Sequence, residues 1–266
     1  MNVDLHTHIL PGIDDGAKDT GTSLEMLNIA RGDGTGQIVL TPHYIHGSVN
    51  NTADIVRKKC IELADTAAKE GIGLELYPGN EVFLGPEIPE LVKEGVICTL
   101  NDSMYVLVEF PVMGIPEYTP EILYQLKLAG YVPIIAHPER YEAVAKNPSV
   151  LYDYILRGVL FQMNSTSLLG LYGKKVRETA LLLLRHNMIH FVSSDAHTCR
   201  GRAPRLQKAR EMVAAISGEN TAVKLFETNG RAVIDNKVIE APEPVKVSKI
   251  SKWFQPSMKL MARIFS

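Results

Sequence analysis

The sequence predicts an α/β fold in which seven parallel strands alternate with helices and close into one barrel. Short runs rich in Val, Ile and Leu alternate with longer stretches of helical periodicity, as expected for a parallel sheet. Six of the seven runs end, within about three residues, on a His, Asp or Glu, and barrel enzymes carry their catalytic groups at such strand ends. With 266 residues, 45% of them hydrophobic, the chain can fill one such barrel.

The first predicted strand begins at Asn2 and ends in two histidines, His6 and His8. Side chains two positions apart on a strand lie on the same face, so both imidazoles can hold one cation. The loop that follows carries two adjacent carboxylates, Asp14 and Asp15, which point in different directions. The residues alone leave open which of the two is a ligand.

The later elements follow in regular alternation. Helices are expected at residues 20–31, 52–70, 86–94, 119–129, 150–157 and 174–186. Further strands are expected at residues 37–41, 74–78, 105–108, 132–136, 160–163 and 189–193. Thr20 or Thr22 is expected to cap the first helix, and Gly32, Gly34 and Gly36 to end it.

Charge and cysteine content exclude several classes of protein. A net charge of -2 argues against a general nucleic-acid binder, which needs a basic surface. Three widely separated cysteines suit a reducing compartment better than a disulfide framework. The sequence shows neither a secretory signal nor a run of roughly 20 apolar residues. A cytoplasmic location is therefore expected.

The candidate metal ligands are the His, Asp and Glu side chains collected at the strand ends. They are His6, His8, Asp15 (or Asp14), His43, Glu81, Glu109, His137, Asp195 and His197. A lone histidine is more often structural, and His46, His186 and His190 are assigned to that class; five of the eight histidines at strand ends are too many for coincidence. Nine nitrogen and oxygen donors suit two or three divalent ions, Mn, Fe or Zn rather than Ca or Mg.

Such a cluster favours hydrolysis of a phosphate ester. Metals roughly 3.5 to 4 Å apart generate hydroxide at neutral pH and clamp the oxygens of the ester. Arg140 follows His137 by three residues and Arg202 follows His197 by five, so both are expected on the same rim. They would act catalytically by adding fixed positive charge for the phosphoryl group and its transition state.

A rival motif supports similar chemistry by another mechanism. The segment from Cys199 to Arg205 matches the C-x5-R loop of cysteine-based tyrosine phosphatases, which needs a thiolate at a strand end surrounded by backbone amides. Pro204 removes one amide donor, and Leu206 stands where a Ser or Thr is usual. The strand end is already occupied by Asp195. The cysteine mechanism is therefore disfavoured.

A run of motifs between residue 2 and about residue 235 resembles a known family. The matching stretches lie at residues 6–8 with 14–16, 41–43, 99–103, 109–110, 135–141 and 193–197. They resemble the PHP (polymerase and histidinol phosphatase) metalloesterases, whose opening motif is His-x-His. They are most similar to the branch of PHP protein-tyrosine phosphatases linked to bacterial capsule and exopolysaccharide synthesis.

The resemblance implies a distorted (β/α)7 barrel with a three-metal site. One ion would be held by His6, His8, Glu81 and Asp195. Glu81 would bridge to a second ion, held with Glu109 and His137, and a third would be held by Asp15, His43 and His197. The family pattern favours Asp15 over Asp14 and matches Arg140 and Arg202 to phosphate-contacting arginines. Mn is expected to support activity best.

The implied substrate is the phosphorylated, tyrosine-rich tail of a bacterial tyrosine autokinase that controls polysaccharide export. A phenolate with a pKa near 10 leaves with less acid assistance than an alkoxide, so the need for a general acid is weak. Two alternatives stay open. One is a PHP phosphatase for a small metabolite such as histidinol phosphate, and the other is a regulatory scaffold that binds the kinase tail with incidental catalysis.

The chain is expected to divide into a barrel at residues 1–240 and a linker with a tail at residues 241–266. Pro242 and Pro244 mark the linker. Residues 245–266 contain five cations, no acidic residue and interleaved apolar side chains: Lys246, Lys249, Lys252, Lys259 and Arg263, with Ile250, Trp253, Phe254, Leu260, Ile264 and Phe265. This basic amphipathic pattern fits peripheral contact with a membrane or an acidic partner, or equally a segment docked on the barrel or without fixed structure.

Overall fold

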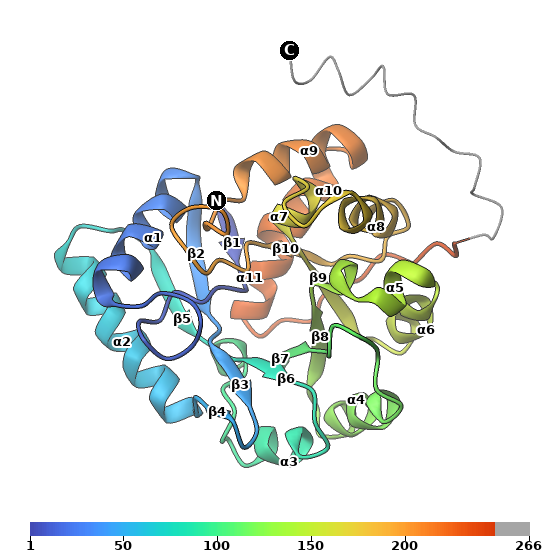
Figure 1. Ribbon diagram of the computed structural model, residues 1–266, viewed down its shortest axis with the longest axis horizontal. Helices are drawn as coiled ribbons and strands as arrows, with labels where there is room; N and C mark the ends of the chain where they lie inside the picture. The colour runs from blue at the N-terminus through green and yellow to red at the C-terminus, as the bar shows by residue number, and fades with distance from the viewer. Residues whose placement is uncertain (248–266) are drawn as a thin grey trace.

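Parallel strands occupy the centre of the protein and helices surround them (Figure 1). The structure is a computed structural model that describes residues 1–247. The predicted tail therefore lies almost entirely outside the described residues. Among the described residues, none of the helices is both long and apolar enough to cross a bilayer.

The strands form two sheets. The first has the order β1-β2-β5, with β1 at Asn2–Asp4, β2 at Thr35–Leu40 and β5 at Glu75–Pro78. The second has the order β10-β9-β8-β7-β6-β3-β4, with β3 at His43–Ile45, β4 at Val49–Asn50, β6 at Glu81–Phe83, β7 at Tyr105–Glu109, β8 at Val132–Ala136, β9 at Leu160–Asn164 and β10 at Phe191–Ser193. Every pair is parallel except the hairpin β3–β4, which the sequence analysis did not predict.

The two sheets are continuous with each other. The second predicted strand breaks into β2 and β3, and the third breaks into β5 and β6. Across both breaks the Gly79 amide donates to the Leu40 carbonyl at 3.0 Å, and the Glu81 amide donates to the Pro42 carbonyl at 3.1 Å. The seven predicted strands are therefore all present.

The first and last strands are also neighbours. Beyond their ends, Thr7 and Ala196 form an isolated parallel bridge. At the end of β1 a side chain takes the place of a backbone partner, because the Ser194 amide donates to Asp4 Oδ1 at 2.9 Å. The segments that carry His6 and Asp195 are thereby held side by side, and the Asp195 amide donates to the His6 carbonyl at 2.9 Å.

Apolar side chains fill the space between the strands near the points where the strands begin. This cluster comprises Val3, Leu5, Val39, Leu100, Tyr105, Leu107, Ile134, Ala136, Leu160, Phe191, Val233 and Ile234. The last two belong to α11 (Asn229–Ile234), so this helix covers that end of the strands. Polar side chains are left to the opposite end, where the strands finish.

The predicted helices are present with small shifts of their ends: α1 at Thr20–Gly32, α2 at Ala53–Lys69, α3 at Ile88–Lys93, α4 at Thr119–Leu128, α6 at Val150–Leu156 and α8 at Lys174–Arg185. The first helix ends at Gly32 as predicted, but the predicted N-caps, Thr20 or Thr22, were wrong. Asp19 is the N-cap, because its carboxylate accepts a hydrogen bond from the Thr22 amide at 2.8 Å. Gly36 does not end this helix but lies within β2.

Five further helices were not predicted: α5 at Glu142–Lys146, α7 at Ser165–Leu168, α9 at Gln207–Ser217, α10 at Glu219–Val223 and α11. The longest, α9, has no local capping residue. Its first amides at Leu206 and Gln207 donate to Asp33 Oδ2 at 2.5 and 2.8 Å. A cap supplied by a residue far away in the sequence gives no local signal.

We expect Gly230→Ala to lower the free energy of unfolding by about 1–3 kcal/mol, as overpacking does. A Cβ at this position of α11 would lie 2.7 Å from the Cβ of Val3, so the helix would have to move away from β1. Urea denaturation measures the effect. Gly32→Ala in α1 is the control, because its Cβ would meet nothing within 4 Å; it is expected to be neutral or stabilising. Equal effects of the two variants would contradict this packing.

Candidate metal centre

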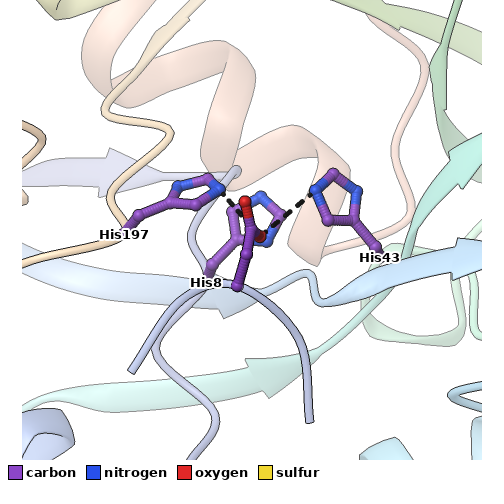
Figure 2. A group of neighbouring side chains, drawn as sticks. His8, His43 and His197 are labelled. Atoms are coloured by element: carbon purple, nitrogen blue, oxygen red, sulfur yellow. Dashed lines mark ion pairs between the residues drawn. The ribbon is translucent and has the colours of Figure 1, made fainter. Parts of the chain in front are cut away.

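The nine predicted ligands gather where the strands finish. Seven of them form three overlapping groups, and within each group the donor atoms lie within 4.8 Å of one another: first His6, His8 and Glu81; second His43, Glu81 and Glu109; and third His8, Asp15, His43 and His197. Asp195 lies against the first group through His6, and His137 lies against the first and second groups through Glu81. Figure 2 shows the rings of His8, His43 and His197 gathered around one point, and Asp15 forms ion pairs with His43 and His197.

The first group brings four acceptor atoms together. His6 Nε2 and His8 Nε2 lie 3.2 Å apart, and each lies 3.2 Å from Glu81 Oε2 and 3.5 Å from Asp195 Oδ1. A divalent ion with bonds of about 2.0–2.2 Å holds its ligands roughly 3.0–3.5 Å apart. The spacing of these four atoms therefore fits one shared ion.

The hydrogen bonds of the Nδ1 atoms of His6 and His8 explain why a cation is needed between their Nε2 atoms. His6 Nδ1 lies 2.9 Å from Gln162 Oε1, and His8 Nδ1 lies 2.8 Å from Asp14 Oδ2. Both partners accept, so both Nδ1 atoms carry the proton and each Nε2 lone pair faces the other. Two lone pairs and two carboxylates in contact repel each other unless a positive charge lies between them.

The same negative charges also favour the protonated form of His8. Burial lowers the pKa of His8, but the hydrogen bonds and charges of Asp14 and Glu81 outweigh burial and raise its pKa to about 10. A divalent ion carries twice the charge of a proton and would displace it from Nε2. The carboxylates that raise this pKa are thus the feature that favours a metal.

Glu81 connects the first group to the others. Its Oε1 lies 3.1 Å from His137 Nε2, whereas its Oε2 lies 3.0 Å from His43 Nδ1. Glu109 Oε1 lies 3.4 Å from the same His137 nitrogen. One carboxylate oxygen thus faces His6, His8 and His43, and the other faces His137.

Around the third group, the adjacent residues Asp14 and Asp15 have different roles. Asp15 Oδ1 lies 3.2 Å from His197 Nε2 and 3.5 Å from His43 Nε2, and its side chain is 64% exposed. Asp14 is buried and accepts from His8 Nδ1 and from the His43 amide. Asp14 therefore orients a histidine, whereas Asp15 faces the open side of the group.

The two predicted arginines converge on Asp195. Arg140 Nη1 lies 3.1 Å from Oδ2, and Arg202 Nη2 lies 2.8 Å from Oδ1. The Arg140 guanidinium also lies 4.8 Å from the centre of the Tyr172 ring. Burial would raise the pKa of Asp195, but the charges of the neighbouring histidines hold it below its usual range. Both guanidinium groups are thus held in fixed positions beside the ligands.

The sequence analysis missed a chain of buried amides behind the ligands. Gln162 accepts from His6 Nδ1 and donates to Asn164 Oδ1 at 3.0 Å, and Asn164 donates to Asp195 Oδ2 at 2.6 Å. The chain fixes the tautomer of His6 and the direction of the Asp195 carboxylate. Two polar residues on one face of an otherwise apolar strand, β9, were the signal that could have identified it.

The residues set aside in the sequence lie outside the three groups. His190 is buried, accepts from the Phe161 amide at 3.1 Å, and has its pKa lowered by burial to about 4. His186 donates to the Leu182 carbonyl, and His46 is exposed. Burial and the charge of Glu25 raise the pKa of Cys199, which opposes the thiolate that a C-x5-R loop requires.

We expect Gln162→Leu to weaken the affinity for Mn or Zn by about 10- to 100-fold, because His6 loses the acceptor that fixes its tautomer. Chelator competition on the metal-free protein measures this affinity. Gln162→Glu is the matched control, since it keeps an acceptor for His6 Nδ1 and should stay within a few-fold of the wild type. Equal affinities for the Leu variant and the wild type would contradict the role of the amide chain.

Comparison with known proteins identifies the family. A family model described as capsular polysaccharide synthesis, CpsB/CapC, matches residues 2–235. Tyrosine-protein phosphatase YwqE of Bacillus subtilis is 37% identical over 254 residues, which cover 95% of this chain and 100% of the relative. The putative tyrosine-protein phosphatase CapC of Staphylococcus aureus is 36% identical over 252 residues, which cover 95% of this chain and 98% of the relative.

Solved structures agree with these relatives. The fold matches a structure from the work on YwqE of Bacillus subtilis and CpsB of Streptococcus pneumoniae, described as unique metal-dependent tyrosine phosphatases. The TM-score is 0.89 at 36% identity, and the match covers 93% of this chain and 100% of the other. A histidinol phosphate phosphatase from Lactococcus lactis shares only the fold, with a TM-score of 0.51 and 15% identity. The chain belongs to the CpsB/CapC family of capsular polysaccharide synthesis proteins.

Proposed function

We propose that this chain is a metal-dependent protein-tyrosine phosphatase of capsule or exopolysaccharide synthesis. The observation that carries the proposal is the convergence of the donor atoms into three overlapping groups, with two arginines fixed beside them. The relatives named above are tyrosine-protein phosphatases, and the closely matching structure is described as metal-dependent. The reaction is the hydrolysis of a phosphoric monoester.

We propose the finer organisation of the fold as well. Residues 1–240 form a distorted (β/α)7 barrel of the PHP type, and residues 241–266 form a linker and a basic tail. The hydrogen bonds that join the first strand to the last, and the family match over residues 2–235, support the barrel. The protein is expected in the cytoplasm, with peripheral membrane contact through residues 245–266.

The donor set fits two or three divalent ions, Mn foremost and Fe or Zn as alternatives. One ion would be held by His6, His8, Glu81 and Asp195. A second would be held by Glu81, Glu109 and His137, and a third by Asp15, His43 and His197. Nitrogen and carboxylate oxygen ligands without a thiolate suit these metals. Bound there, the ions supply a hydroxide nucleophile at neutral pH and polarise the phosphoryl oxygens.

The arginines bind and orient the ester. Asp195 holds the guanidinium groups of Arg140 and Arg202 from both sides of its carboxylate, so their remaining N–H groups are available for phosphoryl oxygens. Their charge is already in position when negative charge develops in the transition state. The exposed side chain of Asp15 marks the side from which the ester approaches.

The proposed substrate is the phosphorylated, tyrosine-rich tail of a bacterial tyrosine autokinase. The group around Asp15 is open to solvent, which suits a phosphotyrosine presented on a flexible peptide. A phenolate with a pKa of about 10 departs with less acid assistance than an alkoxide, so the reaction has only a weak need for a general acid. The description of the family connects this phosphatase activity to capsular polysaccharide synthesis.

We expect release of phosphate from a phosphotyrosyl peptide, with far slower turnover of histidinol phosphate, in a protein whose metal content is measured in parallel. Exhaustive EDTA treatment should abolish the activity, because the clustered nitrogen and carboxylate ligands can bind an anionic phosphate ester only when cations are present. Mn should restore the activity best. Full activity after metal removal would contradict the mechanism. Preference for histidinol phosphate would instead make the protein a metabolite phosphatase.

Cys199→Ser serves as the matched control for the rival mechanism. The Cys199 thiol lies 3.8 Å from the Thr22 carbonyl, and we expect its replacement to leave turnover within about twofold. Loss of turnover in a Cys199→Ser protein that still binds its metals would support the cysteine mechanism instead.

A further inference from the structure

The guanidinium group of Arg140 contacts an aromatic ring as well as Asp195. A single hydrogen bond joins it to the Asp195 carboxylate, from Nη1 to Oδ2 at 3.1 Å. One such bond defines the orientation of a guanidinium group less well than a bidentate contact does. The Arg140 Cζ atom also lies over the Tyr172 ring, 4.8 Å from its centre. The ring face therefore adds the second restraint that the carboxylate does not supply.

The turn that carries Tyr172 is tightly folded between α7 and α8. Gly170 and Gly173 flank the tyrosine at φ values of 90° and 87°, in the left-handed region that favours glycine. Arg177 Nε in α8 donates to the Leu168 carbonyl at the end of α7, at 3.0 Å. The ring thus projects from a turn whose two ends are tied together.

The same part of the chain also holds the backbone next to Arg140. The adjacent Glu139 is buried, and its Oε1 accepts from the Asn164 amide at 3.0 Å and from the Ser167 hydroxyl at 2.6 Å. Asn164 ends β9 and Ser167 lies in α7, which leads directly to the turn with Tyr172. Arg140 is therefore restrained from one segment at both its backbone and its guanidinium group.

The hydroxyl group of Tyr172 does not take part in these contacts. Its oxygen is buried and has no hydrogen-bond partner among the residues that the structure describes. A buried hydroxyl without a partner lowers stability rather than raising it. Because this oxygen is also closed off from solvent, an approaching phosphate ester does not meet it. The ring, and not the hydroxyl, is the part of Tyr172 that can act on Arg140.

We propose that Tyr172 is a positioning residue, whose ring face fixes the orientation of the Arg140 guanidinium group toward the phosphoryl group. The proposal rests on the phosphatase function proposed above, in which Arg140 contacts the ester. Asp195 is a candidate metal ligand, and a carboxylate that shares its charge with a metal ion attracts a guanidinium group less strongly. The uncharged ring attracts the guanidinium group through its π face whether or not ions are bound.

Hydrolysis of a phosphotyrosyl peptide by the metal-loaded full chain tests the proposal. Tyr172→Leu should lower kcat/KM by about 5- to 30-fold, as the loss of one cation–π contact does. Binding of inorganic phosphate, measured by calorimetry, should weaken in the same variant. Tyr172→Phe keeps the ring face and should stay within about twofold of the wild type. Its unfolding midpoint should equal or exceed that of the wild type, because an unpaired buried hydroxyl is removed.

A double-mutant cycle separates positioning from a general structural role. In an Arg140→Ala protein, Tyr172→Leu should cause no further loss of kcat/KM, because the group that the ring orients is absent. The affinity of Tyr172→Leu for Mn, measured by chelator competition, should equal that of the wild type. Tyr124→Leu is the matched control and should leave kcat/KM unchanged, since Tyr124 is a 58% exposed tyrosine on another helix, α4.

Three outcomes would overturn the proposal. Wild-type kcat/KM in the Tyr172→Leu variant would show that the ring contact has no effect. Equal losses in the Leu and Phe variants would assign the effect to the hydroxyl. A full further loss in the Arg140→Ala background would make the role of Tyr172 independent of Arg140.

Failure of the phosphatase assignment would look different. In that case the wild type itself would not hydrolyse the phosphotyrosyl peptide. Calorimetry with inorganic phosphate would still compare Tyr172→Leu with Tyr172→Phe, and weaker binding by the Leu variant alone would support the ring contact. Equal phosphate binding by the two variants would contradict it.

Discussion

The buried carboxylate of Glu81 is the interaction on which the site depends. It faces His6, His8 and His43 through one oxygen and His137 through the other. Burial raises the pKa of Glu81, but the charge of His6 and the hydrogen bonds of its neighbours hold the pKa well below its usual range. A buried carboxylate of this kind is costly unless positive charge surrounds it. Protons on the histidines or divalent ions can meet that requirement.

The fold makes this concentration of charge possible because apolar and charged side chains occupy opposite ends of the strands. Apolar side chains from the strands and from α11 fill the end where the strands begin. The candidate ligands come from six of the seven strand ends, which a continuous set of hydrogen bonds holds at fixed spacing. Between the first strand and the last, the Asp4 carboxylate accepts the hydrogen bond of the Ser194 amide in place of a backbone acceptor. The contacts that join these two strands also hold His6 beside Asp195.

How far the sequence predicts this structure depends on how local each signal is. The strands, and the gathering of candidate ligands at their ends, were predictable because six of the seven apolar runs end on a His, Asp or Glu, as β8 does at His137. The Asp33 cap of α9 was not, because its partners lie more than 170 residues away. Asp14 and Asp15 are adjacent residues of the same type, so the sequence does not tell them apart. Only the path of the loop makes Asp14 the residue that orients His8 and Asp15 the candidate ligand. The amides of Gln162 and Asn164 are polar groups whose partners become known only when the strands are assembled.

The donor geometry, the two arginines and the family membership support one mechanism, in which neighbouring strand ends would hold the cations that activate the attack on a phosphate ester. Anomalous diffraction from active crystals grown with Mn tests this account most directly. We expect peaks within the groups around His6 and His8, around Glu81 and Glu109, and around Asp15 and His197. An active crystal with no anomalous peak in any of these three places would contradict it.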